Sequence, residues 1–196
     1  MPRRPTRTVP TVILHGWQVA SPDHWQNWLA GELRSAGREV RFPDLPTPEH
    51  PDLGSWLAAL WDTLAGLPDD GFDVVCHSLG SVLWLHHATQ RASTPKPSRV
   101  ALVAPPSPSL GTIELASFFP PPVDVDAVRG AADGTVLVGG DADPQCPEGI
   151  ADAYGRPLKM ATTVIPGGAH LNVESGFGQW PAVLDWCGRD NLAFIA

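Results

Sequence analysis

Short apolar runs alternate along this chain with stretches in which apolar residues recur every three or four positions. Runs rich in Val, Ile, Leu and Thr are typical of buried strands, whereas the wider spacing is typical of amphipathic helices. The pattern predicts strands at 11–14, 40–42, 72–76, 99–104, 135–139 and 161–165. It predicts helices at about 24–36, 53–64, 81–88 and 178–188. Strands and helices that alternate in this way form parallel βαβ units, so we expect an α/β chain.

A serine follows the third predicted strand. Ser78 is the central residue of Cys76-His77-Ser78-Leu79-Gly80, between an apolar run and a helix-like stretch. A serine at an abrupt turn from strand to helix is typical of a nucleophile elbow, whose crowded backbone requires small neighbours. Gly80 meets this requirement, whereas Cys76 stands where the usual pattern has glycine. The N–H of Leu79 would lie at a helix N-terminus, which favours a developing oxyanion. The alternative is a serine in an ordinary βα turn.

Two later strand ends supply partners for this serine. Asp143 follows the strand at 135–139, and His170 follows the strand at 161–165. Serine, acid and histidine, in this order along the chain, match the α/β-hydrolase triad, and open α/β sheets gather their active sites at the carboxyl ends of the strands. Asp141 competes with Asp143 for the role of the acid, because spacing alone does not separate them. The proline after Asp143 favours Asp143.

The first predicted strand leads into a fourth candidate element, His15-Gly16-Trp17. The α/β-hydrolase fold takes its second oxyanion N–H at this position. Gly16 allows the backbone to approach a ligand closely, so the main-chain N–H of Trp17 is the candidate donor. The alternative is that His15 and Gly16 only turn the chain and that Trp17 belongs to the core.

Two further histidines lie near these elements. His24 directly precedes the first predicted helix, and we expect it to start that helix rather than to act in catalysis. His77 is the neighbour of Ser78, and we expect its side chain to point away from the serine hydroxyl into the packing of the elbow.

These motifs resemble those of the retinoblastoma-binding protein 9 / YdeN family of small serine hydrolases, within the α/β-hydrolase superfamily. The resemblance covers nearly all of the chain after residue 10. It is carried by residues 15–17 with 21–29, and by blocks at 76–80, 140–144 and 168–181. It implies an α/β-hydrolase fold, with a mostly parallel sheet between two layers of helices and no large lid. It implies Ser78 as nucleophile, His170 as base and Asp143 as acid. Members act on ester-like substrates in some cases, which leaves the natural substrate open.

A long segment without clear periodicity follows the strand at 99–104. Residues 105–123 contain six prolines, so we expect a loop with one turn near 113–118. Long loops in compact domains are usually functional or flexible. We expect this loop to roof the pocket, with Phe118 and Phe119 in contact with the acyl group of the substrate. The alternative is that both phenylalanines only attach the loop to the core.

Composition limits the classes of protein to be considered. The 196 residues predict one domain at 11–196 after a flexible tail at 1–10, and 43% hydrophobic with 17% charged residues excludes a disordered chain. A net charge of −8 without a basic stripe argues against nucleic acid as partner. No run is long enough to span a membrane. Three widely spaced cysteines suggest no disulfides and favour the cytoplasm.

The sequence thus predicts a serine hydrolase that cleaves carboxylic ester or related acyl bonds of small molecules. The predicted chemistry needs no metal and no organic cofactor, because Ser78, His170 and Asp143 supply nucleophile, base and acid. The alternative is a catalytically quiet α/β-hydrolase fold that serves as a protein-interaction module.

Overall fold

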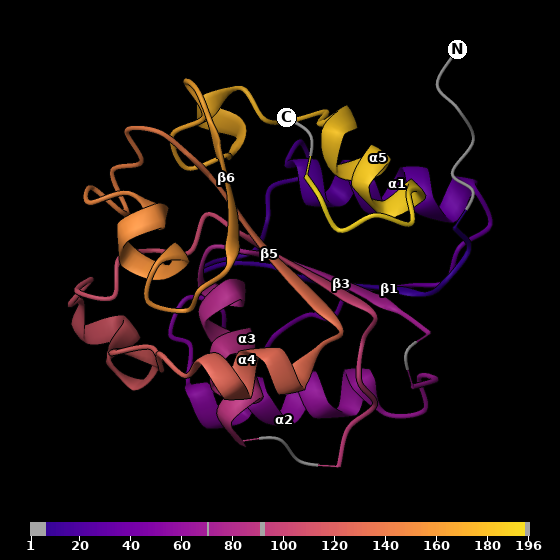
Figure 1. Ribbon diagram of the computed structural model, residues 1–196, viewed down its shortest axis with the longest axis horizontal. Coiled ribbons are helices and arrows are strands. Elements are labelled where there is room, and N and C mark those ends of the chain that lie inside the picture. Colours follow the sequence, from indigo (N-terminus) through magenta and orange to yellow (C-terminus); the bar gives the residue numbers. More distant parts are fainter. Residues whose placement is uncertain (1–6, 70, 91–92, 195–196) are drawn as a thin grey trace.

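A six-stranded parallel sheet forms the centre of the computed structural model, which describes residues 7–69, 71–90 and 93–194 (Figure 1). The strands are β1 (Thr11–Leu14), β2 (Val40–Arg41), β3 (Asp73–His77), β4 (Arg99–Val103), β5 (Gly134–Gly140) and β6 (Ala161–Ile165). Their order across the sheet is β2-β1-β3-β4-β5-β6, and each neighbouring pair is parallel. All six predicted strands are present, with ends that differ by no more than one residue.

Helices cover both faces of the sheet. They are α1 (Trp25–Ser35), α2 (Leu53–Leu64), α3 (Leu79–Gln90), α4 (Val125–Ala131) and α5 (Pro181–Gly188). Figure 1 shows α1 and α5 on one face and α2, α3 and α4 on the other, which confirms the three-layer arrangement. The sequence did not predict α4, because seven residues give too few turns to show a helical period. The described part of the chain has no separate lid domain.

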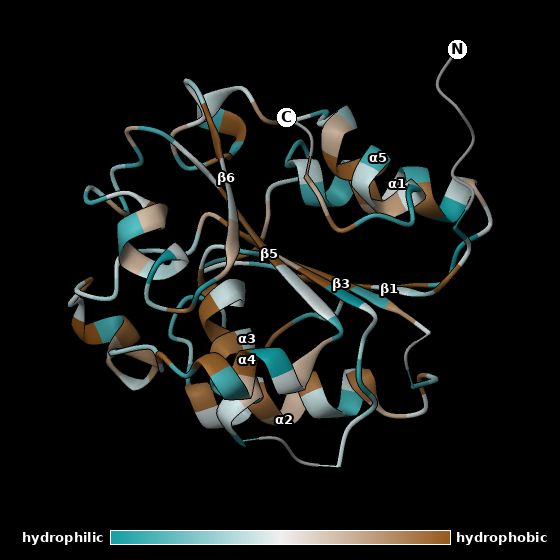
Figure 2. Cartoon of the chain, viewed as in Figure 1, coloured by the Kyte–Doolittle hydropathy of each residue, from teal (hydrophilic) through white to brown (hydrophobic). Residues whose placement is uncertain are grey.

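The core consists of two apolar layers, one on each side of the sheet. All residues of β3 and β4 are buried, as expected for strands covered on both faces. Along β3 the side chains alternate between the layers: Val74 and Cys76 pack toward α2 and α3, and Val75 packs toward α1 and α5. Figure 2 shows hydrophobic residues in the central strands and in the helices around them. No described helix is long and apolar enough to cross a membrane.

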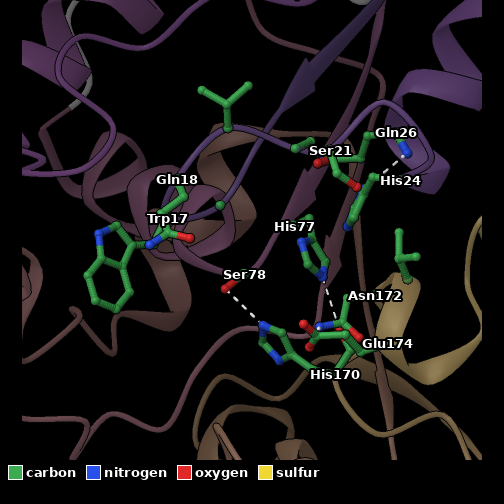
Figure 3. Close-up of a pocket in the computed structure, with 14 residues that line it drawn as sticks. Trp17, Gln18, Ser21, His24, Gln26, His77, Ser78, His170, Asn172 and Glu174 are labelled. Atoms are coloured by element: carbon green, nitrogen blue, oxygen red, sulfur yellow. Dashed lines mark hydrogen bonds between the residues drawn. The ribbon is translucent and has the colours of Figure 1, made fainter.

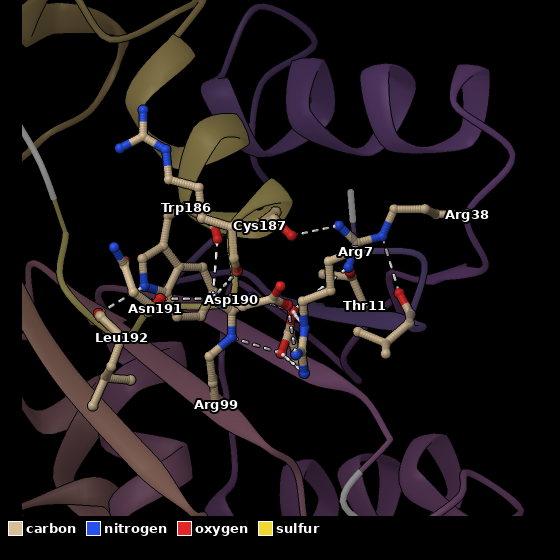
Figure 4. Close-up of polar contacts among 12 residues, drawn as sticks. Arg7, Thr11, Arg38, Arg99, Trp186, Cys187, Asp190, Asn191 and Leu192 are labelled. Carbon is tan, nitrogen blue, oxygen red and sulfur yellow. Dashed lines mark hydrogen bonds and ion pairs between the residues drawn. The ribbon is translucent and has the colours of Figure 1, made fainter. Parts of the chain in front are cut away.

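A buried carboxylate lies at the amino end of β3. Asp73 is fully buried, and Arg99 donates to both of its oxygens, at 3.1 and 2.6 Å. Figure 4 shows Arg99 in this cluster together with Arg7 and Arg38. Arg7 donates to the same carboxylate at 3.3 Å, and Arg38 lies 3.5 Å from it. Charged hydrogen bonds of this kind offset the cost of removing a carboxylate from water.

The same arginines attach α5 to the sheet. The guanidinium of Arg99 lies 4.3 Å from the centre of the Trp186 ring. Its Nη1 donates to main-chain carbonyls at the end of α5 and beyond, those of Trp186, Arg189 and Asn191. Arg38 donates to the carbonyl of Cys187 at 2.8 Å. Cations at a helix C-terminus interact favourably with the helix dipole, so this cluster fixes the last helix to the amino ends of the central strands.

Candidate active site

Ser78 lies in the turn between β3 and α3. Its φ angle is 52°, in the left-handed region that residues other than glycine rarely adopt. Its N–H donates to the carbonyl of Val103 at 2.8 Å, which attaches the turn to β4. A Cβ atom at Gly80 would lie 2.5 Å from the carbonyl oxygen of His15, so this position requires glycine. The turn therefore has the strained geometry of a nucleophile elbow.

Three side chains from three strand ends meet at this turn. Nε2 of His170 lies 3.1 Å from Oγ of Ser78, and Nδ1 of His170 lies 2.8 Å from Oδ2 of Asp143 (Figure 3 shows the first contact). Asp143 is buried, and its second oxygen accepts the N–H of Gln145 at 2.8 Å. A buried carboxylate beside Nδ1 favours the tautomer with the proton on Nδ1, so Nε2 is free to accept the proton of the serine hydroxyl.

The second candidate acid lies elsewhere. Asp141 is exposed, and its Oδ1 accepts the N–H of Gly167 in the turn after β6. The N–H of Asp141 donates to the carbonyl of Ile165. The structure thus brings Asp143 to His170 and leaves Asp141 as a brace of the neighbouring turn.

The loop after β1 packs against Ser78. A Cβ atom at Gly16 would lie 2.8 Å from Cβ of Ser78 and 3.3 Å from its Oγ, so the bare backbone of the loop fills this space. The main-chain N–H groups of Trp17 and Leu79 make no hydrogen bond to any other residue that the structure describes. The indole of Trp17 donates to the carbonyl of Glu49 at 3.3 Å. Free N–H groups beside a nucleophile can stabilise an oxyanion.

A buried histidine holds this loop. Nδ1 of His15 donates to the carbonyl of Gly16 at 2.7 Å, and its Nε2 accepts the N–H of Leu45 at 3.3 Å. Burial lowers the pKa of His15 and keeps the ring neutral, as a ring that donates at one nitrogen and accepts at the other must be. The sequence placed His15 in the candidate oxyanion loop, or in a plain turn as the alternative, and predicted neither of its two hydrogen bonds.

His77 connects the elbow to the loop of His170. Its Nε2 donates to the main-chain carbonyl of His170 at 3.0 Å, and its ring packs edge-on against Trp25. Burial lowers the pKa of His77 well below its usual value, with contributions from His170 and His24. The side chain is buried beside the elbow as expected, but no pattern in the sequence indicated its bond to His170.

A pocket of about 230 Å³ opens beside Ser78 (Figure 3). Its lining residues come from the loop after β1, the start of α1, the elbow and the loop after β6: 16–21, His24, Gln26, His77, Ser78, His170 and 172–174. Trp17, Val19 and Val173 are exposed apolar side chains among them, and Glu174 is the one acidic residue. The lining contains no Lys or Arg.

The structure does not bring Phe118 and Phe119 to this pocket. The predicted turn is present as a 3₁₀ helix at Ile113–Phe118, but the loop at 105–123 contributes no lining residue. Phe118 is fully buried, and its ring meets that of Trp56 edge-on at 5.2 Å. Phe119 is half-buried against the same core layer. Burial of an aromatic ring is strongly favourable, so the loop is attached to the core, as in the alternative interpretation.

The described residues include no group of three or more His, Cys, Asp or Glu side chains that could hold a metal ion. The rings of His24, His77 and His170 are neighbours, with centroids 4.9 and 5.1 Å apart in turn. They pack against one another as tilted rings rather than directing nitrogen atoms to a common point.

Comparison with known proteins shows which proteins this chain resembles. The YdeN protein of Bacillus subtilis strain 168 is 25% identical over 174 residues, which cover 88% of this chain and 91% of YdeN. The crystal structure of the B. subtilis ydeN gene product matches with a TM-score of 0.76 over 91% of this chain and 96% of that one.

More distant structures share the fold. A YdeN-like protein from Pectobacterium atrosepticum matches with a TM-score of 0.69 at 18% identity, over 91% of this chain and 88% of that one. A pyrethroid hydrolase from Sphingobium faniae matches with a TM-score of 0.63 at 13% identity, over 93% of this chain and 98% of that one. The model of the serine hydrolase family matches residues 11–188. The chain therefore belongs to the serine hydrolase family, is YdeN-like, and has the α/β-hydrolase fold.

Proposed function

We propose that this protein hydrolyses carboxylic ester or related acyl bonds of small molecules through Ser78, His170 and Asp143. One observation carries the proposal: the hydrogen-bonded line from Asp143 to His170 to Ser78, with separations of 2.8 and 3.1 Å. A serine, a base within reach of its hydroxyl and a group that orients the base are the parts that nucleophilic acyl transfer needs.

Each of the three side chains has its role in the reaction. Nε2 of His170 takes the proton of Ser78 as Oγ attacks the carbonyl carbon of the substrate. Asp143 holds the ring in position and stabilises the imidazolium that forms. The main-chain N–H groups of Trp17 and Leu79 donate to the oxygen on which negative charge develops. The imidazolium then protonates the leaving alcohol, and an acyl group remains on Ser78.

Hydrolysis of the acyl-enzyme repeats these steps with water. His170 accepts a proton from the water molecule as its oxygen attacks the acyl carbonyl, and it returns this proton to Oγ of Ser78 when the acid leaves. Every group that the cycle uses belongs to the protein or the substrate.

The pocket favours small, uncharged substrates. Its volume of about 230 Å³ is below the range of roughly 300–1,000 Å³ usual for drug-sized ligands. Trp17, Val19 and Val173 offer apolar contacts at its edge, while Glu174 repels anions and no lining cation attracts them. Neutral esters with short chains therefore fit this pocket better than fatty acyl or anionic esters.

The alternative of a protein-interaction module gives the opposite result in a labelling experiment. A fluorophosphonate probe reacts with an activated serine, so we expect the wild type to be labelled at one residue. Ser78→Ala should remove the label and lower kcat for p-nitrophenyl butyrate by about 10⁴-fold or more. Its Tm should change by less than about 2 °C, because the substitution removes one hydroxyl and leaves the core unchanged. An unlabelled wild type, or an active Ser78→Ala variant, would contradict the proposal.

A further inference from the structure

His24 caps helix α1 with its side chain. The main-chain N–H of Gln26 donates to Nδ1 of His24 at 3.2 Å. Helix N-caps are usually Ser, Thr, Asp or Asn, whose side-chain oxygens accept such a bond, and here a ring nitrogen takes their place. The expectation that His24 starts the first helix is confirmed.

This cap determines which ring nitrogen carries the proton. A main-chain N–H can only donate, so Nδ1 of His24 must accept, and the proton of the neutral ring is then on Nε2. Burial lowers the pKa of His24 to about 4, and His170 adds to the shift, so the ring is neutral at pH 7. Nε2 is therefore an uncharged hydrogen-bond donor.

The donor faces the pocket beside Ser78. His24 is 7% exposed and is one of the lining residues. The side chain of His24 makes one hydrogen bond within the described residues, that of Nδ1 with the N–H of Gln26. Its Nε2 therefore has no partner among them. Figure 3 shows the ring extending from Gln26 toward the side of the pocket where His77 lies. Nε2 is not one of the fully buried polar atoms that lack a partner, so it is open to the pocket, where an acceptor on a ligand can take its hydrogen bond.

Hydrogen bonds within the protein hold His24 and the residues beside it in place before any ligand binds. Nδ2 of Asn27 donates to the carbonyls of Ala20 and Ser21, at 3.1 and 2.8 Å, and the N–H of His24 donates to the carbonyl of Ser21 at 2.9 Å. A donor fixed before the ligand arrives loses little conformational freedom on binding.

We propose that His24 is a substrate-binding residue whose Nε2–H donates to an oxygen of the substrate other than the scissile carbonyl. The enzyme then favours esters that carry an ether, hydroxyl or keto oxygen near the scissile bond over plain hydrocarbon esters of the same shape. This inference rests on the proposed function.

Two pairs of matched esters test the inference, one for each side of the scissile bond. p-Nitrophenyl methoxyacetate and p-nitrophenyl butyrate differ in the acyl part by one oxygen in place of a methylene. 2-Methoxyethyl acetate and butyl acetate differ in the same way in the alcohol part. The ratio of kcat/KM within each pair, ether over hydrocarbon, reports the contact of the ether oxygen.

Two variants separate the role of His24 as the helix cap from its role as a hydrogen-bond donor to the substrate. His24→Asn keeps an acceptor near the position of Nδ1 and has no donor near that of Nε2, whereas His24→Gln places an amide N–H near Nε2 and caps poorly. We expect His24→Asn to keep its Tm and to lower the ratio in one pair by about three- to tenfold. His24→Gln should keep the ratio and lower Tm by about 2–4 °C. His24→Ser, also a good N-cap, replaces His24→Asn if that variant does not fold.

The possible results either support the inference or overturn it. A lower ratio in His24→Asn that His24→Gln preserves supports the inference. Ratios unchanged in both pairs, or ether and hydrocarbon esters slowed equally, overturn it, because His24 then acts only as a cap. A wild type that hydrolyses none of the four esters and resists the fluorophosphonate overturns the proposed function, and this inference with it.

Discussion

The polar groups at the two ends of β3 differ in whether they have hydrogen-bond or ion-pair partners. At the amino end, the buried carboxylate of Asp73 contacts three arginines, Arg99, Arg38 and Arg7. At the carboxyl end, five positions later, Ser78 has a left-handed backbone. The main-chain N–H groups of Trp17 and Leu79 beside it are unpaired within the described part of the chain.

The difference separates stability from reactivity along a single strand. A buried charge is tolerated when hydrogen bonds satisfy it, so the amino end holds the fold together. Unpaired donors and a strained backbone are unfavourable in the resting protein but are available to a reacting carbonyl. Substitutions at the first end should therefore change stability, and substitutions at the second should change activity.

The largest expected effect concerns the acid at the active end. Asp143→Asn should lower kcat for p-nitrophenyl butyrate by about 10⁴-fold, because an amide beside Nδ1 can stabilise the wrong tautomer of His170. Asp141→Asn is the matched control and should change kcat only slightly, since Asp141 contacts a turn and not the ring. The reverse result would exchange the two aspartates and leave Ser78 and His170 in their roles.

The opposite end should respond in stability. Asp73→Asn removes the charge that three guanidinium groups share, and we expect it to lower the free energy of unfolding by about 3–5 kcal/mol. Asp190→Asn is the control, because Asp190 also faces Arg7, at 3.6 Å, but is 80% exposed. It should cost less than about 1 kcal/mol. Urea denaturation measures both, and equal losses in the two variants would refute the comparison.

Low pH should protonate the buried histidines near Ser78, whereas the arginines around Asp73 keep their charge. The pKa of His24 is lowered to about 4 in the folded protein, so between pH 6.5 and pH 4 the unfolded chain binds a proton that the folded protein does not. Stability should therefore fall as pH decreases through this window, by about 2–3 kcal/mol from His24. Urea denaturation at several pH values should give a smaller slope for His24→Asn; identical slopes would contradict the assignment.

The smallest effect should come from His77, whose ring donates to the main-chain carbonyl of His170. His77→Leu removes the donor to the carbonyl of His170 and should lower kcat by about tenfold, with KM nearly unchanged. His77→Gln can still donate to this carbonyl and should recover most of the loss. A variant in which kcat and Tm fall together, without rescue by Gln, would indicate a purely structural role.

Much of this organisation could be predicted from the sequence. Continuous apolar runs define the buried strands β1, β3, β4 and most of β5, and the ends of these strands agree with the prediction to within one residue. Parallel strands present their carboxyl ends at one edge of the sheet, so Ser78, Asp143 and His170 were expected to meet. Their roles in catalysis stay predictions until the variants above are measured.

The remainder depends on contacts between segments that are distant in sequence. Residues 105–123 have no periodicity that shows which way the loop folds, and Phe118 packs against Trp56 instead of the pocket. The second role proposed for His24 follows from the orientation of its ring, which spacing does not encode. His77 meets the carbonyl of a residue 93 positions away, and only the folded chain shows that bond.

The ion pair at Asp73 also affects the register between β3 and β4. Asp73 and Arg99 are paired residues in the ladder between β3 and β4, so the carboxylate and the guanidinium meet in one register only. A slip of one residue would turn Val75 to the wrong layer and separate Asp73 from Arg99. The ion pair therefore favours the register in which Ser78 follows the carboxyl end of β3 beside the pocket. An aspartate at the opposite end of the strand thus contributes to the placement of the serine.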